Sequence, residues 1–193
     1  MKKEDKNGIK KELKRNKKEL IDYNWILKII ITSFIIAIIF SLLSESIIPK
    51  VNILIGILIL IIFILIGIIF DMVGVAVQAA DVVPFNSMNS RKVKGANIAV
   101  KFKKNADKTS SFCNDVVGDI CGIISGSASS IIASSLALKL NLNIFITMLI
   151  ITGLVSALTI GGKAIGKSIA INKSNYILYE FSKFISNFYK IKK

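Results

Sequence analysis

The sequence predicts an all-α membrane protein with about four transmembrane helices, together with amphipathic cytosolic and juxtamembrane helices. Two observations predict this fold class. First, 53% of the 193 residues are hydrophobic, whereas a soluble domain has about 45–50% apolar residues spread along its length. Second, the hydrophobic residues form long runs, and the 26 lysines and arginines lie mainly between and beyond those runs. This alternation is typical of a chain that crosses a bilayer several times.

The first two hydrophobic runs cover residues 26–43 and 51–70 and are almost unbroken. A helix that crosses a hydrocarbon core needs roughly 20 such residues, so each run predicts one span. A basic N-terminus before an apolar run can also be a secretory signal. Here the run is too long, and residues 44–50 offer no convincing small-x-small cleavage site. We therefore expect a retained, additional transmembrane helix over residues 25–48.

Small and polar residues interrupt the apolar pattern at the end of the second run. They recur at spacings of four, three, four and three, and they are Gly67, Asp71, Gly74, Gln78 and Asp81. This spacing places them on one face of a helix. A carboxylate that faces lipid costs about 2.5 kcal/mol or more. Asp71 is therefore expected to face a partner, a cavity or the membrane interface.

The segment between the second and third runs, residues 84–112, predicts a cytosolic helical hairpin. Pro84 is expected to end the preceding helix, and Asn86 and Ser87 can cap a short helix. The apolar stripe that follows comprises Val93, Ala96, Ala99 and Val100 and is flanked by lysines. We expect one or two amphipathic helices at the membrane surface.

The third run covers residues 116–138 and begins with Asn114, Asp115 and Asp119. Two interpretations of these residues stay open. Their oxygens are suitable ligands for a hard cation such as Mg²⁺. Equally, Asn and Asp at a helix N-terminus cap the helix and interact favourably with its dipole. Glycines 118, 122 and 126 repeat every four residues, which favours close helix packing in lipid.

The fourth run covers residues 144–160 and also carries one polar stripe. Its members are Thr152, Ser156, Thr159 and Lys163, at spacings of four, three and four. Three helices thus each have one polar face, and the simplest packing turns these faces toward one another. We expect acids of the second and third helices to meet Lys163 in an ion pair.

Residues 166–193 predict an amphipathic juxtamembrane helix. Ile177, Phe181, Phe184 and Phe188 recur at spacings of four, three and four, and lysines supply the polar side. Such a helix is expected to lie in the membrane interface.

The distribution of basic residues predicts the orientation. Nine lysines and arginines lie in residues 1–20, seven in 84–112 and seven in 163–193, against one each in 44–50 and 139–143. The positive-inside rule then places both termini in the cytosol and the protein in the cell (inner or plasma) membrane. The basic cytosolic tail, residues 1–24, is either a solvated tail or a segment that binds anionic lipid.

Several function classes are not expected. The net charge of +14 is accounted for by the segments flanking the membrane, so no nucleic acid is expected as a partner. The chain has no histidine, which excludes the usual Cys/His zinc sites. We expect Cys113 and Cys121 to act as small apolar side chains in the packing, and nothing indicates a disulfide framework. Without a nucleophile paired with a base, or a cofactor loop, we do not expect an enzyme.

Three stretches carry a resemblance to a known family. They are Asp-Met-Val-Gly-Val-Ala at 71–76, Cys-Asn-Asp at 113–115, and Gly-Lys-Ala-Ile-Gly-Lys-Ser-Ile-Ala at 162–170. In this order, over roughly residues 55–190, the chain resembles the transmembrane domain of the cyclin M (CNNM) and CorB/CorC proteins, which are linked to magnesium and cobalt export. The resemblance implies such a domain over residues 51–165, after the additional helix, and a homodimer.

The resemblance implies a site for Mg²⁺, bound or transported, at which Asn114 is retained as a metal ligand, and we expect Asp71, Asp115 and Asp119 to supply oxygens in place of the family's other ligands. It also has departures. The family's serine and glutamate ligands of the first stretch are replaced by Val73, Val75 and Ala76, and Lys163 stands where the family has a glutamate. The family's nucleotide-binding CBS pair does not follow the matched segment, so regulation by ATP is not expected and a separate cytosolic partner is an alternative.

Two functions follow from this resemblance. The first is a multi-pass transporter, or transporter-related protein, for Mg²⁺ or Co²⁺ of the CNNM/CorB type. The alternative is a non-transporting relative with a structural or partner-binding role, in which the ammonium of Lys163 fills the cation position. Gly74, Gln78, Ser156 and Thr159 are expected to line the same site.

Overall fold

The computed structural model describes residues 23–188. The predicted basic tail therefore lies outside the described residues, apart from its last two positions, and so do Tyr189 and the lysines after it. The chain forms two units, residues 1–35 and residues 36–193. Helix α2 (Tyr23–Ile47) begins in the first unit, continues into the second and is followed by the short helix η1 (Ile48–Lys50).

The predicted fold class is confirmed, because the described residues form helices and no strand. Four helical segments are long and apolar enough to cross a membrane: Tyr23–Lys50, Ile53–Ala79, Ala106–Leu140 and Ile144–Asn172. The second is α3 and the fourth is α8. The third is built from α6 (Ala106–Ser111), the π-helical segment η2 (Phe112–Gly118) and α7 (Asp119–Leu140). The chain is therefore compatible with a multi-pass membrane protein.

Asparagines mark the turns between these spans. The Asn52 side chain accepts a hydrogen bond from the Leu54 amide at the start of α3, and Asn143 does the same for the Ile146 amide at the start of α8. Asn141 ends α7 in a left-handed conformation, with φ of 53°, which Asn tolerates better than most residues. Short turns thus set α7 and α8 antiparallel.

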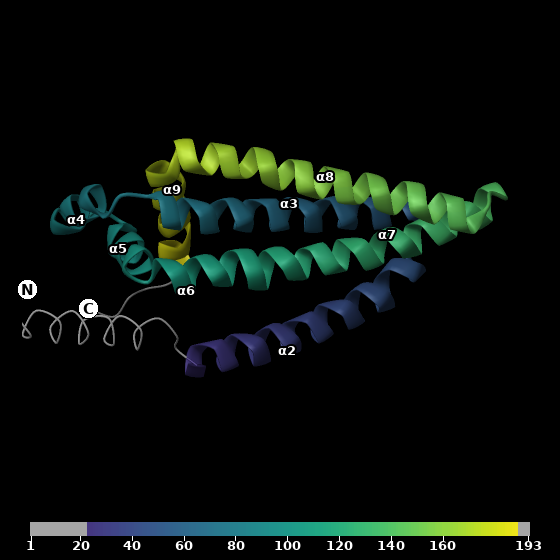
Figure 1. Ribbon diagram of the computed structural model, residues 1–193, viewed down its shortest axis with the longest axis horizontal. Coiled ribbons are helices and arrows are strands. Elements are labelled where there is room, and N and C mark those ends of the chain that lie inside the picture. The colour runs from purple at the N-terminus through teal and green to yellow at the C-terminus, as the bar shows by residue number, and fades with distance from the viewer. Residues whose placement is uncertain (1–22, 189–193) are drawn as a thin grey trace, which may run out of the picture. The chain divides into compact units, whose positions relative to one another are not determined.

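Helices α3, α7 and α8 lie alongside one another (Figure 1). One buried apolar cluster joins them and consists of Ile48, Leu60, Ile64, Ala128, Ile132 and Val155. Gly67 lies so close to α7 that a β-carbon there would be 3.1 Å from Cys121 Cβ. Small residues therefore determine how near the two helices come, as is usual for helices that pack in lipid.

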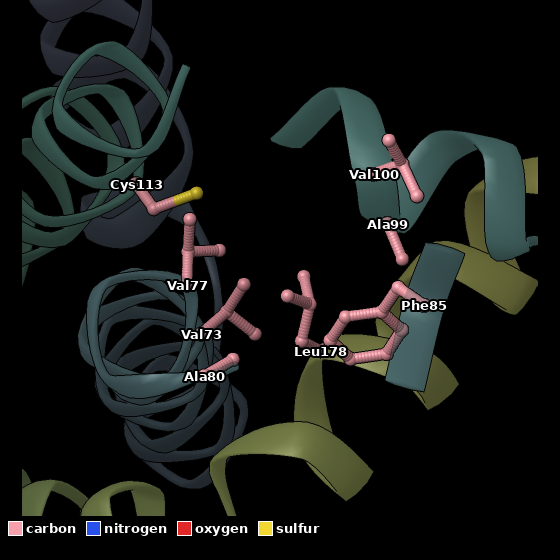
Figure 2. Packing of buried hydrophobic residues seen from close by; sticks show 8 residues of the cluster. All are labelled: Val73, Val77, Ala80, Phe85, Ala99, Val100, Cys113 and Leu178. Atoms are coloured by element: carbon pink, nitrogen blue, oxygen red, sulfur yellow. The ribbon is translucent and has the colours of Figure 1, made fainter. Parts of the chain in front are cut away.

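Three shorter helices gather at one end of α3, α7 and α8 (Figure 1). They are α4 (Val82–Ser90), α5 (Ala96–Lys104) and α9 (Ser174–Phe188), and α9 runs across the end of α3 (Figure 1). Figure 2 shows how Leu178 of α9 points between Phe85 of α4 and the α3 residues Val73 and Val77. These residues belong to a second buried apolar cluster, which attaches α4, α5 and α9 to the end of α3. Helix α5 contributes Ala99 and Val100 to this cluster and therefore packs against other helices.

Three local predictions were wrong. Helix α3 ends at Ala79, before Pro84, which instead lies in the first turn of α4, where its missing N–H leaves no hydrogen bond unmade. Asp81, and not Asn86 or Ser87, caps that helix by accepting from the Val83 amide. Helix α8 continues to Asn172, so residues 166–172 belong to the fourth span and the separate C-terminal helix begins only at Ser174.

The apolar face of α9 is also rotated from its predicted position. Leu178 and Ser182 are completely buried, and Phe181 is partly buried against Phe70 and Phe102. Phe184 and Phe188, by contrast, make an edge-to-face contact with ring centroids 5.1 Å apart and are exposed. The stripe of phenylalanines therefore divides between two environments.

Candidate functional site

The polar face of α3 is only half as long as predicted. Gly67, Asp71 and Gly74 are buried on it, and Asp71 is only 4% exposed. Gln78 is exposed, and Asp81 is exposed beyond the end of the helix. Asp71 is therefore the acid of this face that the structure buries, one helical turn from each glycine.

Asn114 lies opposite this face, inside the π-helical segment η2. The helical run begins eight residues earlier, at Ala106, so Asn114 and Asp115 do not cap a helix and that interpretation was wrong. Asn114 Nδ2 donates to Ser110 Oγ at 3.3 Å, while its Oδ1 is buried without a hydrogen-bond partner. A β-carbon at Gly74 would overlap that oxygen, so Gly74 makes the room in which Asn114 lies.

Helix α8 approaches the same place through a repeated Gly-Lys pair, Gly162-Lys163 and Gly166-Lys167. A β-carbon at Gly162 would overlap Ile68 of α3, and one at Gly166 would be 3.4 Å from Ile68 Cγ2. The glycines thus permit close contact between α8 and α3. Each neighbouring lysine then reaches a carboxylate on another helix.

Lys163 forms the predicted ion pair with an acid of the third span, whereas the buried acid of the second span pairs with a different lysine. Lys163 Nζ lies 3.5 Å from Asp119 Oδ1 and donates to the Gly118 carbonyl oxygen at 3.4 Å. The Lys163 side chain is 19% exposed and that of Asp119 is 68% exposed. The buried partner of this pair is the lysine.

A second ion pair was missed by the sequence reasoning. Lys167 Nζ lies 3.5 Å from Asp71 Oδ2, and here the acid is the buried partner, since its side chain is 5% exposed against 50% for Lys167. Asp71 Oδ2 nevertheless has no hydrogen-bond partner. The Gly-Lys repeat was the available signal, because it places Lys167 one turn beyond Lys163 on the same side of α8.

The other predicted residues lie less centrally. Asp115 is exposed, and so is Ser156. The hydroxyl of Thr159 donates to the Val155 carbonyl of its own helix at 2.8 Å, a common way for threonine to satisfy itself in a helix. Across residues 23–188, no three His, Cys, Asp or Glu side chains gather as a metal site would require, so the four predicted ligands are not brought together.

An apolar cavity of about 250 Å³ lies near this site but contributes no ligand to it. Its lining comes from the second half of α2, from α3 and from η2 and α7, and comprises Ile36, Phe40, Phe63, Ile66, Val116, Val117, Ile120, Cys121 and Ile124. Hydrocarbon side chains line almost all of it, so it has no oxygen to offer a cation.

The site thus combines oxygens from two helices with ammonium groups from a third. Asp71 and Asn114 each have a buried oxygen without a hydrogen bond, the Gly118 carbonyl points at Lys163, and two lysines neutralise two carboxylates. Such an arrangement can hold a cationic group by charge and by oxygen donors. Comparison of the chain with family models, curated proteins and solved structures finds no match.

Proposed function

We propose that this chain is a multi-pass membrane protein that binds and moves a divalent cation, Mg²⁺ or a similar hard ion, as the resemblance to the CNNM and CorB/CorC proteins implies. One observation carries the proposal. Asp71 Oδ2 and Asn114 Oδ1 are both buried between helices without a hydrogen-bond partner. Leaving a buried acceptor unpaired costs about 1–3 kcal/mol, and more for a charged one. A cation coordinated by both oxygens offsets this unfavourable free energy.

The position of these oxygens supports the same proposal. Asp71 and Asn114 lie within two of the four segments that are able to cross a membrane. Ionisable side chains inside such segments are costly in lipid and usually mark a path for ions or substrates. Carboxylate and amide oxygens are also the donors that Mg²⁺ prefers. The bilayer is the partner of the outer faces of α3 and α8, where large aliphatic side chains are exposed.

The contacts of Lys163 favour a second candidate, a relative that does not transport. In that case the protein has a structural or partner-binding role. The ammonium of Lys163, 3.4 Å from the Gly118 oxygen and 3.5 Å from Asp119, then permanently occupies the position of the cation. The two candidates differ in one property, namely whether an added divalent cation binds.

Calorimetric titration of the full-length protein in nanodiscs with MgCl₂ tests the proposal. The wild type should bind Mg²⁺. At a Mg²⁺ concentration a hundred times Kd, binding should add about 2.7 kcal/mol to the free energy of unfolding and so raise the melting temperature. Asp71→Asn should lose both effects. Asp107→Asn is the matched control, because Asp107 is an exposed acid in α6.

Flux measurements then separate the two candidates. Transport predicts Mg²⁺ movement in liposomes that Asp71→Asn abolishes and Asp115→Asn, at an exposed position, reduces less. If the wild type neither binds nor moves Mg²⁺ while Lys163→Glu gains binding, the non-transporting candidate is correct.

A further inference from the structure

We propose that the ammonium of Lys167 is an exchangeable occupant of the Asp71 carboxylate, which a bound cation displaces and which then turns to solvent. This inference rests on the proposed function, because it concerns how the same site is regulated. It makes Lys167 a positioning residue that lowers the apparent affinity for the cation and keeps the buried charge neutral when no cation is bound.

The geometry distinguishes Lys167 from Lys163 as the exchangeable group. Lys163 is 19% exposed, donates to the Gly118 carbonyl oxygen and is an ion-pair partner of Asp119, so two contacts hold it in place. Lys167 is 50% exposed, and among the described residues its polar contact is the ion pair with Asp71 at 3.5 Å. Lys167 lies five residues before the end of the fourth span at Asn172, so its long side chain can reach toward the water at the membrane interface.

The contact between Lys167 and Asp71 is also incomplete. At 3.5 Å it neutralises charge, but it supplies no hydrogen bond to Asp71 Oδ2, which has none from any described residue. A buried carboxylate that is neutralised but not hydrogen-bonded remains under-satisfied. A cation with direct oxygen coordination satisfies it better, and this difference supplies the driving force for exchange.

Competition of this kind has a measurable consequence. If Lys167 must leave before a cation binds, the apparent dissociation constant exceeds the intrinsic one by the inverse of the fraction of molecules in which Lys167 has left. With roughly one molecule in ten open, removal of the ammonium tightens binding about tenfold. An arginine at this position has the opposite effect, because a guanidinium can bind the carboxylate in a bidentate manner and leaves less readily.

Calorimetric titration with MgCl₂ of the full chain in nanodiscs tests this on four proteins: the wild type, Lys167→Met, Lys167→Arg and, for comparison, Lys163→Met, which removes the other ammonium of the site. We expect Lys167→Met to bind Mg²⁺ about tenfold more tightly than the wild type, with a lower melting temperature in EDTA because Asp71 then lacks its counter-charge. Lys167→Arg should bind more weakly, and Lys163→Met should not bind more tightly.

The outcomes separate this inference from the function on which it rests. If the wild type binds Mg²⁺ but Lys167→Met binds equally or less tightly, or if Lys163→Met gains as much, the exchange is overturned and the cation site stands. If none of the four proteins binds Mg²⁺, the proposed function fails and the exchange fails with it. Should Lys167→Met not fold, the comparison of the wild type with Lys167→Arg decides, since equal affinities contradict the exchange.

Discussion

Gly74 of α3 and Asn114 of η2 are in such close contact that no side chain fits between them. A β-carbon at Gly74 would overlap the Asn114 carboxamide, and a backbone hydrogen is all that the position allows. The asparagine cannot retreat freely, because its Nδ2 is bonded to the buried Ser110 hydroxyl. The orientation of Asn114 Oδ1 toward α3 is therefore set by packing as well as by hydrogen bonding.

We expect Gly74→Ala to destabilise the protein by about 1–3 kcal/mol, the usual cost of overpacking a close contact, and to weaken any Mg²⁺ binding. The melting temperature in detergent or nanodiscs measures the first effect. Gly153→Ala is the control, because Gly153 is exposed on α8 with no atom within 4 Å of an added β-carbon. That change should be neutral or stabilise by roughly 0.5–1 kcal/mol. Equal losses from both variants would contradict the contact.

The residue pattern predicted part of this site. The ion pair of Lys163 with an acid of the third helix was predicted, as was the inward position of Asp71, because a lipid-facing carboxylate is costly. The pair between Lys167 and Asp71 was not, since helical periodicity indicates which side chains share a face but not which lysine on one helix reaches which acid on another. That depends on the distance at which the helices pack.

At the level of elements, Asn114 lies against Gly74 of α3, whereas Asp115 and Asp119 are exposed. Neighbouring residues of a helix point in different directions, about 100° apart in an α-helix, so the inward position of Asn114 leaves Asp115 on another face. Nothing in residues 112–118 signals that this segment is a π-helix. Pro84 was misassigned for a different reason: a proline indicates either a helix end or a first turn.

The end of α3 depends on a residue from another element. Lys103 of α5 donates from Nζ to the carbonyl oxygens of Val77 and Gln78, at 3.2 and 2.7 Å. These are carbonyls of the last turn of α3, which have no partner within the helix, and a cation there also interacts favourably with the helix dipole. Lys103 thus joins the α4–α5–α9 end structure to the span that carries Asp71.

Replacing Lys103 by Met should lower the free energy of unfolding by about 1.5–3 kcal/mol, the range for hydrogen bonds made by charged groups. Helix α3 should fray first at its C-terminal end, so the amide hydrogens of residues 75–80 should exchange faster. Lys104→Met is the matched control, because Lys104 is its exposed neighbour and should change stability by less than about 0.5 kcal/mol. Equal protection of the α3 end in both variants would show that Lys103 does not cap it.

At the level of the whole molecule, the hydrophobic runs predicted the number of spans well, because about 20 apolar residues in sequence have few other uses. Three features were beyond the reach of the sequence. They are the extension of the third span back to Ala106, the extension of the fourth to Asn172, and the packing of α5 and α9 over the end of α3. Each arises where polar residues lie within or beside a span, and hydropathy alone does not resolve such boundaries.

Four crossings with both ends on one side are the central claim of this account, because the inward-facing site has meaning only in a bilayer. Labelling of single cysteines in intact cells with a membrane-impermeant maleimide tests it most directly, in a background with Cys113→Ala and Cys121→Ala, at the exposed positions Ser46, Ser90, Leu142 and Asn187. We predict immediate labelling of Ser46→Cys and Leu142→Cys, and labelling of Ser90→Cys and Asn187→Cys only after permeabilisation. Labelling of Ser90→Cys or Asn187→Cys in intact cells, or protection of Leu142→Cys, would contradict it.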